Sequence, residues 1–219
     1  MLFPISFVWS RFGTEAGQTI DSILQRKERE RLANGGVFYW GIGNAVGPSV
    51  AALVSQADRP EVLFSPIKSP ARQEDAHPQC VVTWTEAIGL NGDPYTLPFR
   101  SLITSRFTVG RQHHYALVCS SDSPLTNAHN ADRSTSEGIF LGDLCNFLTG
   151  RQIGASQVTA VVQRRGQQSA SGTVYPVSFR AKLVPPYFIR LSAPRPISRE
   201  HVRRWTPDSL VACPEAVTV

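Results

Sequence analysis

The residues best suited to chemistry in this sequence are two adjacent histidines, His113 and His114, which follow Arg111. A histidine acts as a general base when a carboxylate such as Asp143 or Glu86 orients it. Neighbouring residues of a strand point to opposite faces, so only one of the pair can enter a given pocket. Three interpretations stay open. One histidine is packed in the fold and the other is exposed, without a chemical role. Alternatively, the histidines serve a metal-dependent nuclease or nucleotide hydrolase, or His113 holds a phosphate or a base edge.

The common catalytic and metal-binding motifs are missing from the sequence. It contains no G-x-S-x-G elbow, no Walker loop and no H-E-x-x-H, and its four cysteines show no C-x-x-C spacing. We therefore expect no metal and no cofactor, and we favour a binding protein over an enzyme.

Tryptophans form the second group of candidate residues. Trp9, Trp40 and Trp84 each fall within a predicted strand, and Phe38 and Tyr39 join them. Tryptophan is costly to bury because its N–H needs a partner, and stacking on a base contributes roughly 1–3 kcal/mol. The rings are suited either to an aromatic core or to a pocket that stacks a flat ring.

Arginine supplies most of the positive charge, and this charge is concentrated in the last third of the chain. Residues 1–150 hold 12 Lys+Arg and 14 Asp+Glu, whereas residues 151–219 hold 10 and 3. The planar guanidinium group binds phosphate or carboxylate through two parallel hydrogen bonds. This pattern predicts phosphate contacts from Arg164, Arg165, Arg203 and Arg204, with an acidic protein partner as the alternative.

The elements that must position these residues are mostly strands. Thr19 is a suitable N-cap for a helix over 20–34, whose outer face would carry the RKERER run, and Gly47-Pro48 opens a second helix. Two further short helices are predicted at 99–105 and around 137–149. Apolar, β-branched and aromatic runs predict strands at 5–9, 37–42, 61–68, 80–88, 114–121, 158–164, 173–183 and 187–194.

Composition and element order together predict the fold class. The chain is long enough to bury a core, and 42% hydrophobic with 18% charged residues excludes wholesale disorder. The elements do not alternate regularly as in a doubly wound sheet. We expect an α+β fold with a curved or closed antiparallel β-barrel and two to four short helices. Because no secretion signal or membrane span is recognisable, we expect a cytoplasmic protein.

One segment, LANGGVFYWGIGNAVGPSVAALV at 32–54, resembles the EVE-type branch of the PUA-like superfamily, whose relatives include YTH and SRA domains. In that branch a helix ends in a glycine-containing turn, and an aromatic strand follows. The segment FVWSR lies where such domains begin. The resemblance implies a PUA-like barrel that holds a modified, flipped or unpaired base between aromatic rings.

The resemblance covers about residues 5–165 and also implies which residues would hold the base. We expect a single domain over 1–194, and the arginine-rich end of the chain predicts a basic extension over 195–219. The expected partner is modified DNA rather than RNA, in a restriction or defence system, without a membrane and with the oligomeric state open. The base pocket that the resemblance implies comprises Trp9, Ser10, Trp40, Gly43, Asn44, Ser65 and Trp84. Independently of the resemblance, Arg11, Lys68, Arg111 and His113 are further phosphate-binding candidates.

Overall fold

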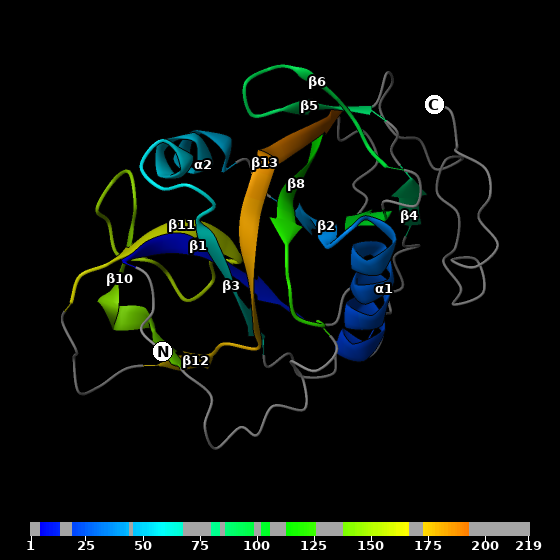
Figure 1. Ribbon diagram of the computed structural model, residues 1–219. Helices are drawn as coiled ribbons and strands as arrows, with labels where there is room; N and C mark the ends of the chain where they lie inside the picture. The colour runs from blue at the N-terminus through cyan, green and yellow to red at the C-terminus, as the bar shows by residue number, and fades with distance from the viewer. Residues whose placement is uncertain are drawn as a thin grey trace.

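The structure is a computed structural model that describes residues 5–13, 19–43, 46–67, 80–83, 86–98, 102–105, 113–125, 138–166 and 173–192. Within these ranges the chain forms two α-helices, thirteen strands and one short 3-10 turn (Figure 1). The helices are α1 (Ile20–Ala33) and α2 (Gly47–Val54), and the 3-10 turn is η2 (Leu141–Asp143). The strands are β1 (Ser6–Phe12), β2 (Val37–Ile42), β3 (Glu61–Pro66), β4 (Cys80–Thr83), β5 (Glu86–Gly89), β6 (Pro94–Thr96), β7 (Leu102–Ser105), β8 (His113–Ser120), β9 (Gly138–Phe140), β10 (Leu144–Asn146), β11 (Thr159–Arg164), β12 (Val174–Pro176) and β13 (Phe179–Ser192).

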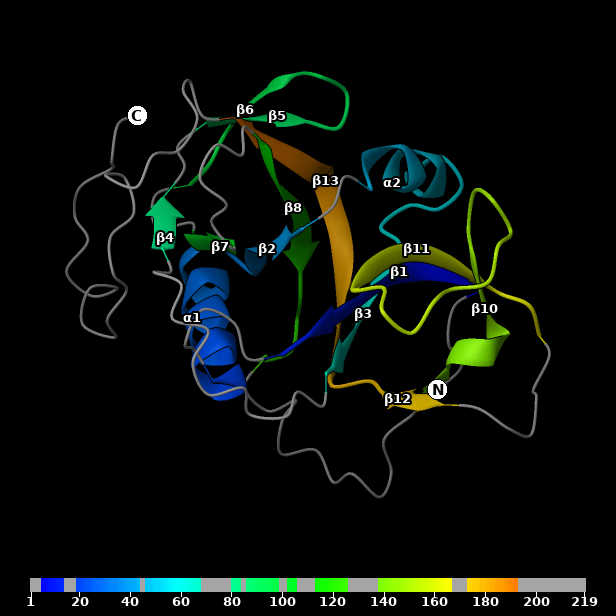
Figure 2. The same cartoon turned by 180° about the vertical axis from the view of Figure 1, so that it is seen from behind.

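Nine of these strands form one mixed sheet, which both cartoon views show curving around the core (Figures 1 and 2). Its main path runs β10-β11-β1-β3-β13-β5-β6, while β8 pairs with β13 and β2. The pairs β9–β12 and β4–β7 form two small separate sheets. β10 therefore lies at one edge of the large sheet.

The predicted closed antiparallel barrel is wrong. Among the described residues the nine-stranded sheet stays open, and its β1–β3 pair is parallel. The sheet branches at β13, whose register with β8 shifts between Leu183 and Phe188, because its first part pairs with β3 and its last part with β5. Among the described strands β10 pairs with neither β2 nor β6, so the ends of the sheet do not meet.

Both helices predicted from the first 54 residues are confirmed. The Thr19 side chain accepts a hydrogen bond from the Ser22 N–H at 3.2 Å and caps α1. At the other end Gly35 and Gly36 have φ of +62° and +96°, and the Gly36 N–H donates to the Arg31 carbonyl at 2.8 Å. This left-handed turn ends α1 and leads directly into β2.

The RKERER run was expected on the outer face of α1, and most of it is buried. Arg26, Lys27, Glu30 and Arg31 are each 9% exposed or less. The Lys27 ammonium lies 2.6 Å from Glu30 and also donates to the Tyr39 carbonyl. Burial lowers the pKa of Lys27 from 10.5 to about 8. Ion pairing and hydrogen bonds to backbone carbonyls thus allow this charged face to pack against β2.

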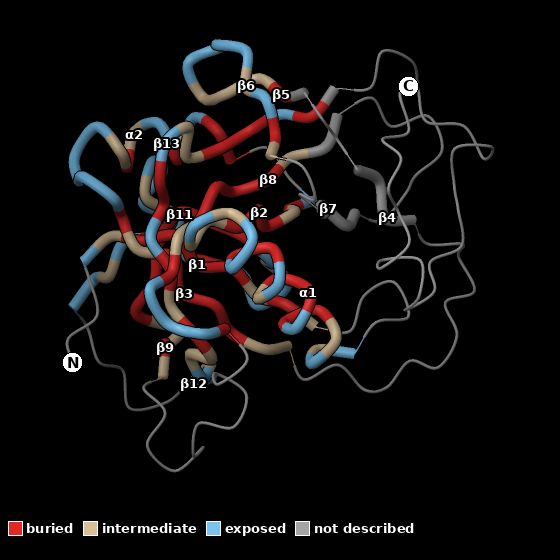
Figure 3. The backbone as a smooth tube through the Cα atoms, turned by 45° about the vertical axis from the view of Figure 1, so that its right-hand side comes forward, coloured by how far each residue is buried: buried red, intermediate tan, exposed pale blue. Residues whose placement is uncertain are grey.

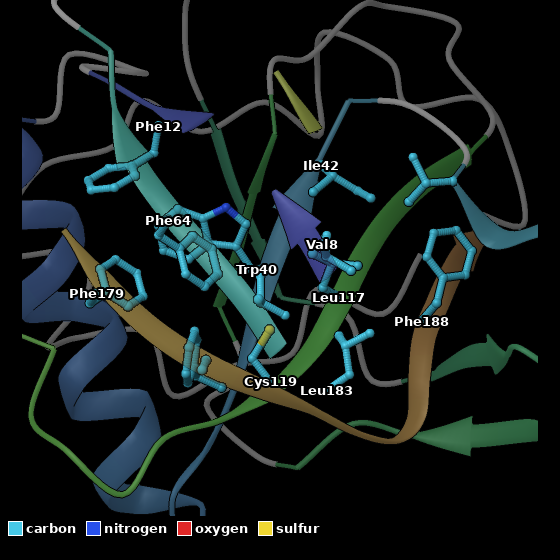
Figure 4. Packing of buried hydrophobic residues seen from close by; sticks show 14 of the residues in the cluster. Val8, Phe12, Trp40, Ile42, Phe64, Leu117, Cys119, Phe179, Leu183 and Phe188 are labelled. Carbon is cyan, nitrogen blue, oxygen red and sulfur yellow. The ribbon is translucent and has the colours of Figure 1, made fainter. Parts of the chain in front are cut away.

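The core consists of three clusters of buried side chains. In the largest, the Trp40 ring packs against Phe64 at 4.7 Å and Phe12 at 5.6 Å between ring centroids (Figure 4). Tyr39, on the other face of β2, belongs to a second cluster, so both faces of this strand are buried. Figure 3 shows buried backbone along the central strands, with exposed stretches at the β5–β6 turn.

The two helices predicted at 99–105 and 137–149 are wrong. Leu102–Ser105 forms β7, and β9, η2 and β10 occupy 138–146. The apolar residues of the second segment suit either a helix or short strands, because runs of this length do not distinguish the two. Pairing of Leu144 with Arg164 and of Cys145 with Gln163 places β10 beside β11. Cys119 and Cys145 are buried free cysteines.

Candidate nucleic-acid interface

Arg11, one of the predicted phosphate-binding residues, is half-buried against aromatic rings. Its guanidinium carbon lies 4.7 Å from the Tyr175 ring centroid and 5.7 Å from that of Trp9. The same group donates to the carbonyls of Ala155 and Gln157. Arg11 therefore fastens the loop before β11 to the sheet, through cation–π contacts and hydrogen bonds.

Arg164 and Arg165 are adjacent in sequence but differ in their surroundings. The Nε of Arg164 donates to Asp143 Oδ2 at 2.9 Å, and this carboxylate is almost fully buried. Arg165 is exposed, and its Nη2 donates to the Gly150 carbonyl at 2.6 Å. In the described ranges no carboxylate pairs with Arg165, so its charge faces solvent in a fixed position.

A turn between β10 and β11 adds another arginine to this edge of the sheet. Asn146 Oδ1 accepts hydrogen bonds from the N–H groups of Leu148 and Thr149 at 3.1 and 3.0 Å, and Gly150 has φ of +65°. Asparagine and glycine favour this backbone path. The turn presents Arg151 to solvent, again without a carboxylate partner among the described residues.

Arg151 and Arg165 share the sheet edge with two exposed glutamines. Cys145 of β10 pairs with Gln163 of β11 on one side and forms an isolated bridge with Gln152 on the other. Residues 138–166 contain three arginines and a single acidic residue, Asp143. We call the four exposed residues Arg151, Gln152, Gln163 and Arg165 the β10 edge surface; the strands that carry it lie at the left of Figure 1.

Sequence reasoning predicted Arg165 but missed Arg151, Gln152 and Gln163. The signal was present in the segment Asn146–Gly150, where asparagine and glycine mark a turn. Assigning a helix around 137–149 hid this turn and the strand edge beside it. No polar periodicity marks Gln163, because the four residues before it in β11 are all buried.

The structure places Trp9 and Trp40 in different core clusters. Trp9 is fully buried, and its indole Nε1 donates to Ser65 Oγ at 3.0 Å. The parallel pairing of β1 with β3 brings these two residues together. Trp40 lies in the largest cluster with Phe64.

Two of the other predicted base-pocket residues, Ser10 and Gly43, have different surroundings, and the remaining two lie outside the described residues. Ser10 is buried, with its Oγ 3.1 Å from Thr159 Oγ1. Gly43 is exposed just after β2. Asn44 and Trp84 lie outside the described residues. The base pocket drawn from these residues stays a prediction.

Four of the predicted phosphate-binding residues, Lys68, Arg111, Arg203 and Arg204, lie outside the described residues, as does the predicted extension at 195–219. The backbone of His113 pairs with that of Ser192, and the backbone of His114 pairs with that of Leu191; the side chains of both histidines lie outside the described part of the structure. The part of the chain that is described holds no group of three His, Cys, Asp or Glu residues placed to bind a metal ion. Neither α1 nor α2 has the length and apolar character to cross a membrane.

Comparison with known proteins returns no match to a family model, to a curated protein or to a solved structure. The ligand must therefore be inferred from the side chains of this chain alone.

Proposed function

We propose that this protein is a nucleic-acid-binding module that contacts DNA through the β10 edge surface. The observation that carries the proposal is the pair of exposed arginines without described carboxylate partners, Arg151 and Arg165. Arg165 is held in place by the Gly150 carbonyl. A guanidinium held in this way loses less side-chain entropy when it binds a phosphate.

The contrast with Arg164 supports a phosphate-binding role for its two neighbours. Asp143 compensates the charge of Arg164, and it is the single acidic residue in 138–166. Arg151 and Arg165 thus leave this edge with a net positive charge. Two positive groups on one edge attract a polyanion over distances comparable to the Debye length.

We propose DNA rather than RNA as the ligand, as expected from the sequence. β11 pairs with β10 on one side and with β1 on the other, so this edge belongs to a larger sheet and is not a free two-stranded ribbon. The proposal of duplex DNA therefore depends on the exposed arginines and on the closely spaced phosphates of the duplex.

A pair of charge-matched variants tests this proposal. Fluorescence anisotropy at low salt compares three proteins. They are the wild type, the double variant that carries both Arg151→Gln and Arg165→Gln, and a control double variant that carries both Arg29→Gln and Arg59→Gln. Arg29 in α1 and Arg59 between α2 and β3 are exposed arginines that do not belong to the β10 edge surface. We expect the first double variant to bind duplex DNA about tenfold or more weakly and the control to bind nearly as the wild type does. Equal loss in both variants, or no loss in either, contradicts the assignment of the site.

Recognition of a modified base is the second part of the proposal, and it requires a different measurement. Trp40 packs inside the core, so replacing it would unfold the protein before it reported on binding. The informative comparison is the affinity of the wild type for matched modified and plain duplexes. Equal affinities across a panel of modifications would remove base selection and leave the arginine contacts in place.

A further inference from the structure

Arg151 and Arg164 project to the same face of the sheet at its β10 end. Arg164 of β11 lies directly opposite Leu144 of β10, so their side chains share a face. On the other side of β10, Gln152 lies opposite Cys145, whose side chain points to the other face because it follows Leu144. Arg151 precedes Gln152 and therefore points to the same face as Arg164.

The two arginines differ in what holds them. Arg151 is exposed, and no carboxylate in the described part of the chain pairs with it. The Nε of Arg164 donates to Asp143 Oδ2 at 2.9 Å. The Arg164 side chain is 32% exposed, whereas the Asp143 side chain is 3% exposed. Arg164 therefore reaches solvent, but a buried carboxylate holds its guanidinium group.

The surroundings of Asp143 strengthen its interaction with Arg164. Asp143 ends η2 and is buried there. Together with Arg164 it lines a small pocket whose walls include Phe7, Ile139 and Phe140. Because apolar walls lower the local dielectric constant, this ion pair is stronger than one surrounded by water. A phosphate that approaches Arg164 must therefore compete with the carboxylate of Asp143.

We infer that Asp143 is a positioning residue that holds Arg164 away from the phosphates of bound DNA and so limits the affinity of this edge, an inference that rests on the proposed function. A phosphate beside the ion pair meets one positive and one negative charge, whereas a phosphate beside Arg151 meets a positive charge alone. Neutralising Asp143 would make Arg164 available as a further phosphate contact on the face that it shares with Arg151.

A double-mutant cycle followed by the salt dependence of DNA binding tests this inference. Fluorescence anisotropy on duplex DNA compares the wild type, Asp143→Asn, Arg164→Gln and the double variant that carries both substitutions. Asparagine has the shape of aspartate and keeps an oxygen that accepts a hydrogen bond. The control is Asp93→Asn, which makes the same change in net charge at an exposed position between β5 and β6.

We expect Asp143→Asn to make the slope of log K against log salt more negative by about 0.9, the value for one further phosphate contact on duplex DNA. This variant should also bind more tightly than the wild type at low salt. The double variant should return to the wild-type slope, because the arginine that makes the new contact is absent. Arg164→Gln and the control should keep the wild-type slope.

Two results overturn the inference and leave the proposed function standing. The first is a wild type that binds duplex DNA with the same slope as Asp143→Asn, or an equal change of slope in Asp143→Asn and Asp93→Asn. The second is an Arg164→Gln slope that is less negative by about one unit, because Arg164 would then contact a phosphate already in the wild type. Arg164→Gln leaves the carboxylate in place, so it tests the inference even where Asp143→Asn does not fold. A wild type that binds no duplex at low salt overturns the proposed function as well.

Discussion

At the scale of single residues, Lys27 is the most unusual group in the described structure. It is fully buried and contacts Glu30 and the Tyr39 carbonyl, and burial lowers its pKa to about 8. Cys119 is buried close by, and burial raises the pKa of its thiol above the usual value. The two shifts have opposite consequences for stability at alkaline pH.

The lysine makes the folded state gain stability as the pH rises from about 8 to 10.5. In this window the unfolded chain binds a proton that the folded chain has released, so the free energy of unfolding rises by at most ~1.4 kcal/mol per pH unit. Cys119 opposes this gain above pH 9, because the unfolded thiol loses its proton first.

Denaturant unfolding at several pH values isolates the lysine contribution. The variant Lys27→Met, Glu30→Gln removes both charges, and Lys182→Met at an exposed position is the control. The free energy of unfolding of the wild type, minus that of the double variant, should increase as the pH rises from 8 to 10.5. A difference that is constant across this window contradicts the account of Lys27.

A substitution at Ser65 distinguishes a structural role of this residue from a role in binding a base. Its hydroxyl is fully buried and accepts the hydrogen bond of Trp9 Nε1 at 3.0 Å. Ser65→Ala leaves this indole N–H without its partner, and we expect a cost of about 1–3 kcal/mol in the free energy of unfolding.

Thermal unfolding and anisotropy on the same Ser65→Ala preparation distinguish the two roles. The structural role predicts lower stability with unchanged affinity for DNA. Unchanged stability combined with lost discrimination between modified and plain DNA would return Ser65 to the predicted base pocket.

At the scale of elements, the turn between α1 and β2 fixes how the charged helix meets the sheet. Gly36 has φ of +96°, and its N–H donates to the Arg31 carbonyl. A Cβ at this φ is strained, so Gly36→Ala should destabilise the protein by about 1–2 kcal/mol.

Gly154→Ala is the matched control for this turn. The nearest atom to its added Cβ would be Ser156 Oγ at 3.8 Å, an ordinary contact. Urea unfolding should therefore show a lower midpoint for Gly36→Ala and an almost unchanged one for Gly154→Ala. Equal midpoints would mean that the turn does not need glycine at position 36.

The elements that could be predicted from the sequence are those with strong local signals. Thr19 and the glycines after residue 34 mark both ends of α1, and Pro48 marks the start of α2. The aromatic run at 37–42 coincides with β2. Segments at 102–105 and 138–146 became strands because of partners distant in sequence, and local pattern does not encode those partners.

The candidate site residues divide in the same way: the sequence indicates their types, but their positions depend on strand partners that are distant in sequence. The sequence singled out Trp9 and Trp40 by type but could not place them in separate clusters, because this depends on the pairing of β1 and β2 with other strands. The burial of the RKERER face was also unpredictable, since charged residues usually face solvent unless partners are provided. Gln152 and Gln163 became candidates through the register of β10.

At the scale of the whole molecule, the described tryptophans and the two exposed arginines of the β10 edge surface occupy different parts of the fold. Residues 1–150 carry a net charge of −2 and residues 151–219 carry +7, from 12 against 14 and 10 against 3 charged residues. In the described ranges the tryptophans are in the core, whereas Arg151 and Arg165 are at the sheet edge. This division predicts that overall affinity depends on charge at one edge and is insensitive to conservative changes in the core.

The salt dependence of DNA binding tests the central claim most directly. Counterion release makes log K fall linearly with log salt, with a slope close to −0.9 for each phosphate contacted on duplex DNA. We expect the wild type to bind duplex DNA in a strongly salt-dependent manner. The double variant that carries both Arg151→Gln and Arg165→Gln should have a slope of log K against log salt that is less negative by about two units. A wild type that does not bind DNA at low salt, or a slope that the two substitutions leave unchanged, would contradict the account.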